Sequence, residues 1–151
     1  MTRHVVFGTG QIGRLVAEQL VARGHDVTAV NRSGRGRIDG ATVVGGDATD
    51  AEFTGRAAAG AESVYFCLNA THYDRWPQEF PPMQRGVLAG ARAAGARLVV
   101  LDNGRVVETG PVDEVFQAPR ASITRALLDA VPRLPRGPAA ADPRSLPRHR
   151  W

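Results

Sequence analysis

The sequence predicts an α/β protein built around a doubly wound parallel sheet of about five strands in the order 3-2-1-4-5. Short runs of β-branched and apolar residues alternate with alanine-rich stretches, as in chains of βαβ units. A glycine-rich turn at residues 8–13 joins the first apolar run to the first helical stretch. Beyond residue 103 the alternation stops, so we expect only a short helical extension and a disordered tail there.

The expected elements follow from periodicity and from the residues that end helices. Ile12, Leu15, Val16 and Leu20 fall at helical spacing, and Gly24 ends that helix. The stretch between the second and third strands is rich in glycine and arginine and too short for a full helix. Strands are expected at 4–7, 26–30, 42–44, 63–68 and 97–101, and helices at 12–23, from 49 or 50 to 59, and at 82–94.

The residues after 103 are of a different kind. A short strand is expected at 104–109, a turn and one helical turn at 111–116, and an amphipathic helix at 122–131. Five prolines and five arginines lie within residues 132–151, and proline at that density removes backbone donors and breaks helices. We therefore divide the chain into a domain at 1–103, an extension at 104–131 and a disordered tail at 132–151.

Composition excludes several classes of protein. With 151 residues, 43% of them hydrophobic, the chain is long enough for one domain with a core. The single cysteine, Cys67, excludes an intrachain disulfide and a cysteine-based zinc site, which fits a reducing cytosol. Apolar runs such as 98–101 are far shorter than a membrane span, and the first residues lead into no signal-peptide core. We expect a cytoplasmic protein without membrane contact or bound metal.

All 19 basic residues are arginines, since the sequence contains no lysine. Five arginines and one acid lie within residues 132–151, which accounts for the whole net charge of +4. Residues 1–131 are therefore electrically balanced, which argues against a basic nucleic-acid-binding face on the folded part. Any nucleic-acid binding would be confined to the tail.

Gly8, Gly10 and Gly13 form a Gly-x-Gly-x-x-Gly turn between a predicted strand and a predicted helix. The first glycine permits a tight turn, the second lets the backbone approach a pyrophosphate, and the third lets helix pack closely on strand. The helix N-terminus offers free amides and a positive dipole to phosphates. The alternative is a structural turn with glycines by chance. We predict a Rossmann-like dinucleotide site with these pyrophosphate-binding residues: Gly8, Gly10, Gln11, Ile12 and Gly13.

The end of the second strand distinguishes NAD from NADP, because NAD binders place an acid there for the ribose hydroxyls. Asn31, Arg32 and Ser33 stand at the expected distance, with Asn31 21 residues after Gly10, and none is a carboxylate. Arg32 suits a 2′-phosphate, so the sequence favours NADP over NAD, with Asn31 beside it in the site. Arg35 and Arg37 either assist in that role or belong to a solvated loop.

Two further candidates follow strand ends at the same edge of the sheet. Asp47, after the third strand, can address the adenine amino group, or it can simply close a turn. Asp50 fits a helix cap better than a ligand. Asn69 follows the fourth strand at the carboxyl edge, where open α/β sheets bind ligands, whereas Cys67 is expected to be a buried strand residue.

Together these residues resemble the NAD-dependent epimerase/dehydratase family, the extended or atypical short-chain dehydrogenases. The likeness covers about residues 4–103 and rests on residues 5–13, 22–32, 46–50 and the aromatic loop 73–77. It implies a Rossmann domain of oxidoreductase type that binds NAD(P), and, in complete family members, a C-terminal region that completes the substrate site. It does not identify a substrate.

The sequence departs from this family at the proton-transfer pair. Family enzymes commonly use a tyrosine with a lysine four residues later, and this chain has no lysine. Its tyrosines, Tyr65 and Tyr73, lie in or just after the fourth strand rather than after the fifth. His72 and Tyr73 can in principle exchange protons, but a loop histidine beside an aromatic is more often a surface feature. The sequence therefore assigns no catalytic residue.

Residues 104–134 resemble a different family, at the C-terminal end of oligopeptide-transporter ATP-binding subunits. The likeness rests on residues 104–111, 114–116 and 124–132. A P-loop needs a lysine for the β- and γ-phosphates, so this chain cannot hydrolyse ATP by that route. We hypothesise a fusion or truncated product in which a dehydrogenase's cofactor half runs into a foreign tail. The alternative is a chance likeness.

Three interpretations remain open. The leading one is an NAD(P)-binding Rossmann protein of the epimerase/dehydratase type, in which cofactor binding is retained and catalysis is doubtful. The second is a non-catalytic module for dinucleotide sensing or protein interaction. The third is a fragment with uncovered apolar sheet surface, which self-association into a homo-oligomer would cover.

Overall fold

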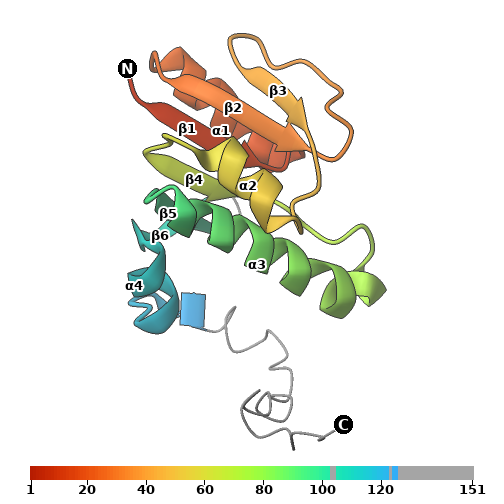
Figure 1. Cartoon of the computed structure of the whole chain (residues 1–151), viewed down its shortest axis with the longest axis vertical. Coiled ribbons are helices and arrows are strands. Elements are labelled where there is room, and N and C mark those ends of the chain that lie inside the picture. The colour runs from red at the N-terminus through yellow and green to blue at the C-terminus, as the bar shows by residue number, and fades with distance from the viewer. Residues whose placement is uncertain (103–104, 123, 126–151) are drawn as a thin grey trace, which may run out of the picture.

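The computed structural model describes residues 1–102, 105–122 and 124–125. In this part of the chain six strands form one sheet in the order β3-β2-β1-β4-β5-β6 (Figure 1). The first five are parallel and confirm the predicted order, and an antiparallel sixth strand adds to its edge. The strands are β1 (Arg3–Phe7), β2 (Asp26–Asn31), β3 (Thr42–Gly45), β4 (Ser63–Phe66), β5 (Arg97–Asp102) and β6 (Arg105–Pro111).

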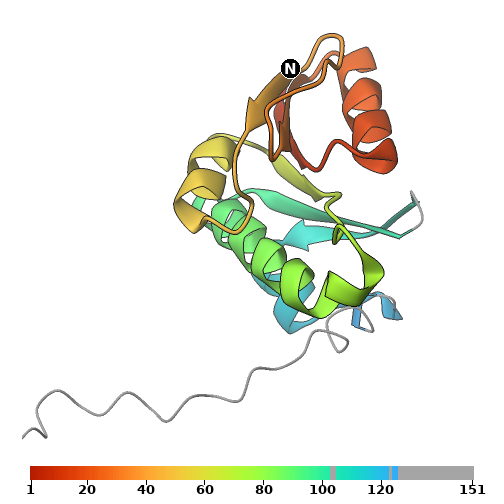
Figure 2. The same ribbon diagram turned by 90° about the vertical axis from the view of Figure 1, so that its right-hand side faces the viewer.

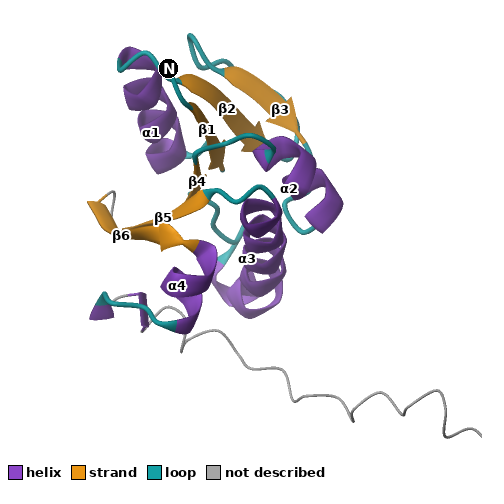
Figure 3. Cartoon of the chain, turned by 60° about the vertical axis from the view of Figure 1, so that its left-hand side comes forward, coloured by secondary structure: helices purple, strands orange, loops and turns teal. Residues whose placement is uncertain are grey.

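Helices cover both faces of the sheet. Figures 2 and 3 show α1 (Gln11–Ala22) on one face, and α2 (Ala51–Ala58), α3 (Trp76–Ala93) and α4 (Val112–Gln117) on the other. Alternate residues of β1 enter opposite cores, since Val5 and Phe7 pack under α2 and α3 while Val6 packs under α1. No helix joins β2 to β3, and Ile38 from that loop fills the α1-side core, where it is 4% exposed.

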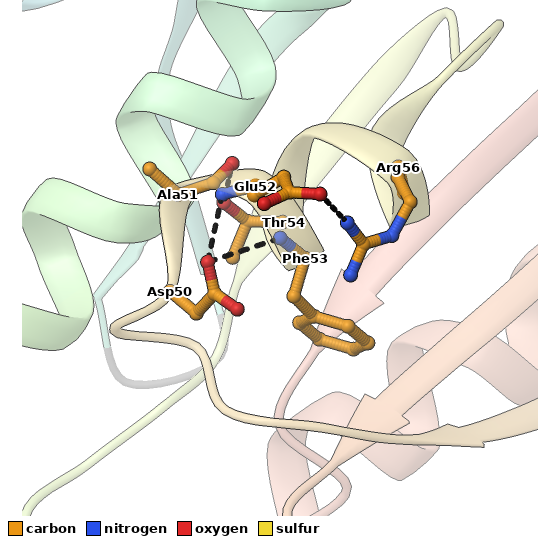
Figure 4. Close-up of polar contacts among 6 residues, drawn as sticks. All are labelled: Asp50, Ala51, Glu52, Phe53, Thr54 and Arg56. Carbon is orange, nitrogen blue, oxygen red and sulfur yellow. Dashed lines mark hydrogen bonds and ion pairs between the residues drawn. The ribbon is translucent and has the colours of Figure 1, made fainter.

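The N-terminus of α2 confirms the cap predicted at Asp50. Its carboxylate accepts hydrogen bonds from the backbone amides of Glu52 at 2.9 Å and Phe53 at 3.3 Å (Figure 4). These contacts satisfy two of the amides that the first turn of a helix leaves without partners. Asp50 therefore fixes where α2 begins.

Close packing of α2 on α3 depends on two glycines in α3. A Cβ on Gly86 would lie 2.0 Å from the Ala48 carbonyl oxygen, and one on Gly90 would lie 2.6 Å from the Thr54 carbonyl carbon. The buried Thr54 hydroxyl donates a 2.7 Å hydrogen bond to the Gly86 carbonyl. Glycine at these two positions lets the helices approach closely enough for the Thr54 side chain to form a hydrogen bond with the backbone of Gly86.

The predicted start of α3 at residue 82 is wrong, because the helix begins at Trp76. Pro81 and Pro82 lie inside it and remove two backbone donors, which normally argues for a boundary there. Aromatic contacts stabilise the earlier turns instead. The Trp76 ring stacks on Phe80, with centroids 4.3 Å apart, and Phe80 meets Phe66 of β4 edge to face at 5.3 Å.

The segment after β5 contains the short strand and helical turn that its sequence predicts, as β6 and α4. Glu108 of β6 accepts the backbone amides of Arg120 at 2.8 Å and Ala121 at 3.3 Å, just before the helical residues Ser122, Thr124 and Arg125. The remainder of the helix predicted at 122–131, and the predicted tail at 132–151, lie outside the described residues. Within the described residues, no helix combines the length and apolar character needed to cross a membrane.

A histidine pair lies at the amino edge of the sheet. The Thr2 hydroxyl is 2.9 Å from His4 Nε2 and 2.9 Å from His25 Nδ1, and the two rings meet edge to face at 4.6 Å. A hydroxyl has one proton and two lone pairs, so it can donate to at most one ring and accepts from at least one. Burial first and the nearby His25 second lower the pKa of His4, against an opposing effect of Glu62.

We expect this pair to make stability depend on pH. Because the folded pKa of His4 lies below the unfolded value of about 6.5, protons bind the unfolded chain more tightly. Stability is then highest above pH 6.5 and falls as pH drops from 6.5 towards the folded pKa. Thermal unfolding between pH 7.5 and 5 measures the loss, which should be smaller in His4→Gln; equal losses in the two proteins would contradict this explanation.

Candidate functional site

The glycine turn after β1 is fixed by contacts that leave no room for side chains. Gly8 has a φ of +101°, and a Cβ there would lie 2.5 Å from the Cys67 carbonyl oxygen. A Cβ on Gly13 would lie 1.9 Å from the Gly8 carbonyl oxygen. The first and third glycines thus permit the tight turn and the close helix packing that the motif predicts.

The middle glycine, Gly10, is in a different environment. It is the N-cap of α1 with a φ of −68°, and a Cβ on it would meet nothing within 4 Å. Gln11 and Ile12, in the first turn of α1, are exposed, and that turn contains no acidic residue. The turn therefore presents open backbone and free amides at the positive end of a helix, a fit for the pyrophosphate of a dinucleotide.

A hollow of about 190 Å³ lies at the carboxyl ends of β1, β2, β3 and β4. It brings together four residues that the sequence analysis selected, namely Asn31, Arg32, Asp47 and Asn69. The glycine-turn candidates do not line it, but the Asn31 side chain links it to that turn through a 3.0 Å hydrogen bond to the Thr9 hydroxyl. The remaining lining residues are Phe7, Val30, Gly46, Ala48, Leu68, Thr71 and Met83.

The charge of Arg32 acts on two carboxylates, Asp47 in the lining of this hollow and Glu79 outside it. Hydrogen bonds from the Thr49 amide and hydroxyl, each 2.8 Å long, lower the pKa of Asp47, and Arg32 adds to the effect. Asp47 thus closes a turn and also lines the hollow. The pKa of Glu79 is lowered chiefly by hydrogen bonds from Thr71, whose backbone amide donates to its carboxylate at 2.8 Å, and further by the charges of Arg75 and then Arg32.

A second hollow shares a lining residue with the first. Asn31 belongs to the walls of both hollows. At this second hollow Arg14 forms an exposed ion pair with Glu18, and Arg37 forms one with Asp39. Exposed ion pairs of this kind contribute little free energy, because water screens the attraction. It is lined by Thr9, Arg14, Asn31, Arg35, Gly36, Arg37, Ile38 and Val43.

Sequence reasoning missed Thr9, Thr71 and Met83 at these hollows. Thr71 follows the fourth strand by a few residues, so its place at the carboxyl edge was a usable signal. Thr9 is a variable position of the glycine motif, and Met83 lies on the distant helix α3, so neither carried a signal in the sequence.

Two titratable side chains at β4, Tyr65 within the strand and Cys67 just after it, are poorly suited to proton transfer. Burial raises the pKa of the Cys67 thiol to about 11. Burial also raises the pKa of Tyr65, whose half-buried side chain packs against the α1-side core. Within the described residues there is also no cluster of three or more groups that could hold a metal ion.

A family profile described as NAD(P)H-binding matches residues 8–133. The chain belongs to this family. The match begins at the first glycine of the turn and continues beyond residue 103, where the epimerase/dehydratase likeness was expected to end. The family and the fold together confirm that this is an NAD(P)-binding Rossmann domain.

Solved structures with the same fold include a Rossmann-fold NAD(P)-binding family protein from Shigella flexneri. It is 22% identical, with a TM-score of 0.55, over 78% of this chain and 58% of its own. Uronate dehydrogenase from Agrobacterium tumefaciens is 22% identical with a TM-score of 0.53, over 63% and 38%. UDP-glucose-4-epimerase from Stenotrophomonas maltophila with bound NAD is 19% identical with a TM-score of 0.56, over 66% and 36%. At these identities the likeness concerns the fold.

Partial sequence matches link the chain to transporter subunits. A peptide import ATP-binding protein of Brucella abortus is 48% identical over 50 residues, 33% of this chain and 15% of that protein. The methionine import ATP-binding protein of Mesorhizobium japonicum is 49% identical over 45 residues, 29% and 12%. These short matches are compatible with the resemblance seen at residues 104–134, and the chain spans only a small part of those proteins.

Two substitutions in the glycine turn should affect different properties, one cofactor binding and the other stability. Gly10→Val should lower the free energy of unfolding by only about 1 kcal/mol, because valine is a poorer N-cap than glycine but the position is open, yet it should abolish cofactor binding. Gly13→Ala should cost about 3 kcal/mol through its clash with Gly8. Urea unfolding and calorimetric titration with NADPH measure the two effects. Unchanged affinity in a folded Gly10→Val protein would contradict the site.

Proposed function

We propose that this protein binds NADP(H) in preference to NAD(H) along the carboxyl edge of the sheet. The observation that carries the proposal is the end of β2, where no carboxylate stands and Arg32 lines the hollow. Arg14, Arg35 and Arg37 border the adjoining hollow, so this end of the site is rich in guanidinium groups. Guanidinium binds a phosphate dianion in bidentate geometry and keeps its charge at any physiological pH.

Each candidate residue has a place along the bound cofactor in this proposal. The pyrophosphate lies at Gly8, Gly10, Gln11, Ile12 and Gly13. Arg32 contacts the 2′-phosphate beside Asn31, Asp47 accepts from the adenine amino group, and Asn69 borders the cofactor beyond β4. The bound cofactor supplies hydride chemistry, while the residues named here bind and orient it.

The proposed reaction class is oxidoreductase of the epimerase/dehydratase type, without that family's tyrosine–lysine pair. A non-catalytic sensing or interaction module is the second candidate, favoured by the same missing pair. Incubation with NADPH deuterated at C4 and a panel of aldehydes and ketones separates them. Deuterium in any product identifies an enzyme, whereas binding without transfer supports the module. The fusion origin, the domain boundaries and the cytoplasmic location stay predictions.

Arg32→Ala should weaken NADPH binding about tenfold to a hundredfold and leave NADH binding nearly unchanged. A charge-assisted hydrogen bond is worth about 1.5–3 kcal/mol, and only NADPH carries the 2′-phosphate. Isothermal titration of both cofactors measures the change. Arg23→Ala, at the far end of α1, is the matched control and should alter neither affinity. Equal losses for NADPH and NADH in Arg32→Ala would remove the reason for preferring NADP.

A further inference from the structure

The side-chain amide of Asn31 is fully occupied within the chain. Its Nδ2 donates to the Thr9 hydroxyl at 3.0 Å and to the Arg35 carbonyl at 2.8 Å. Its Oδ1 accepts from the Gly34 amide at 2.7 Å and from the Ser33 hydroxyl at 3.3 Å. A primary amide has two donors and one oxygen with two lone pairs, so no capacity is left for a ribose hydroxyl.

These bonds join two segments that are distant in sequence. Thr9 belongs to the glycine turn, while Ser33, Gly34 and Arg35 begin the loop that replaces a helix between β2 and β3. The loop is pressed against β3, because a Cβ on Gly34 would lie 3.0 Å from the Gly45 amide nitrogen. Asn31 therefore determines where the arginines of this loop lie relative to the turn that receives the pyrophosphate.

We propose that Asn31 is a positioning residue for cofactor selection, which acts through Thr9 and the 33–35 segment and makes no contact with the ribose. This inference rests on the proposed function, since it concerns the same site. It differs from the general rule for Rossmann folds, in which the side chain at the end of the second strand bonds the ribose itself. Here that side chain organises the loop whose arginines border the second hollow.

Asn31→Asp separates the two roles. If Asn31 touched the ribose, a carboxylate in its place would create the acceptor typical of NAD binders and tighten NADH. If it acts by positioning, the carboxylate loses both donors and sets its charge against the Arg35 carbonyl, so the loop shifts. We expect NADPH to bind about tenfold more weakly, as for one lost hydrogen bond or more, with no gain for NADH.

Thr9→Val tests the connection by removing the acceptor from the other side of the same bond. In titrations of the full chain, Thr9→Val should lower the ratio of NADPH to NADH affinity in the same direction as Asn31→Asp. The double variant should lose less than the product of the two single losses, because both remove one shared contact. Thr42→Val, at an exposed residue that begins β3 and lines neither hollow, is the matched control and should bind nearly as wild type.

Each outcome decides one question. Tighter NADH binding by Asn31→Asp, or independent losses in the double variant, would overturn the positioning role. A changed melting temperature with an unchanged affinity ratio in both variants would also overturn it, since that is what a structural role alone predicts. If Asn31→Asp fails to fold, the ratio measured in Thr9→Val carries the test. A wild-type protein that binds neither cofactor would refute the proposed function rather than this inference.

Discussion

The contact among Gly8, Gly13 and Cys67 is the constraint on which the rest of the site depends. β1, the start of α1 and the end of β4 meet there at distances that exclude a Cβ at either glycine. This contact sets the position of the N-terminus of α1 over the edge between β1 and β4. The free amides of the helix and the hollow beyond β4 then share one edge of the sheet, as open α/β folds require for a ligand.

The two faces of the sheet are built differently, and this difference shapes the site. On one face, α3 packs closely on α2 and on the residues before it through Gly86 and Gly90. Asp47 and Ala48, which lie between β3 and α2, line the first hollow. On the α1 face, a loop anchored by Ile38 takes the place of a second helix. Arg35 and Arg37 of this loop border the second hollow together with Thr9 of the glycine turn.

Local chemistry allowed much of this structure to be predicted from sequence. The strand order followed from alternation, the beginning of α2 from the capping preference of Asp50, and the turn from three glycines whose roles are steric. The start of α3 was missed because the stacking of Trp76 on Phe80 and the contact with Phe66 are tertiary, and they outweigh the two prolines. The saturated amide of Asn31 was equally hidden, because three of its partners depend on the path of an irregular loop.

The titratable groups of the described residues whose pKa values are shifted each keep one protonation state at neutral pH. Around the hollow, hydrogen bonds lower the pKa values of Asp47 and Glu79, so both stay ionised at neutral pH. Burial raises the pKa of Cys67 to about 11 and raises that of Tyr65, so both stay protonated. His4, whose pKa is lowered, lies at the opposite edge of the sheet. Guanidinium groups need no titration to bind phosphate, whereas hydride transfer to a carbonyl needs a matched proton donor. Within these residues, the permanent positive charge of Arg32 at the hollow is the feature suited to a phosphate group.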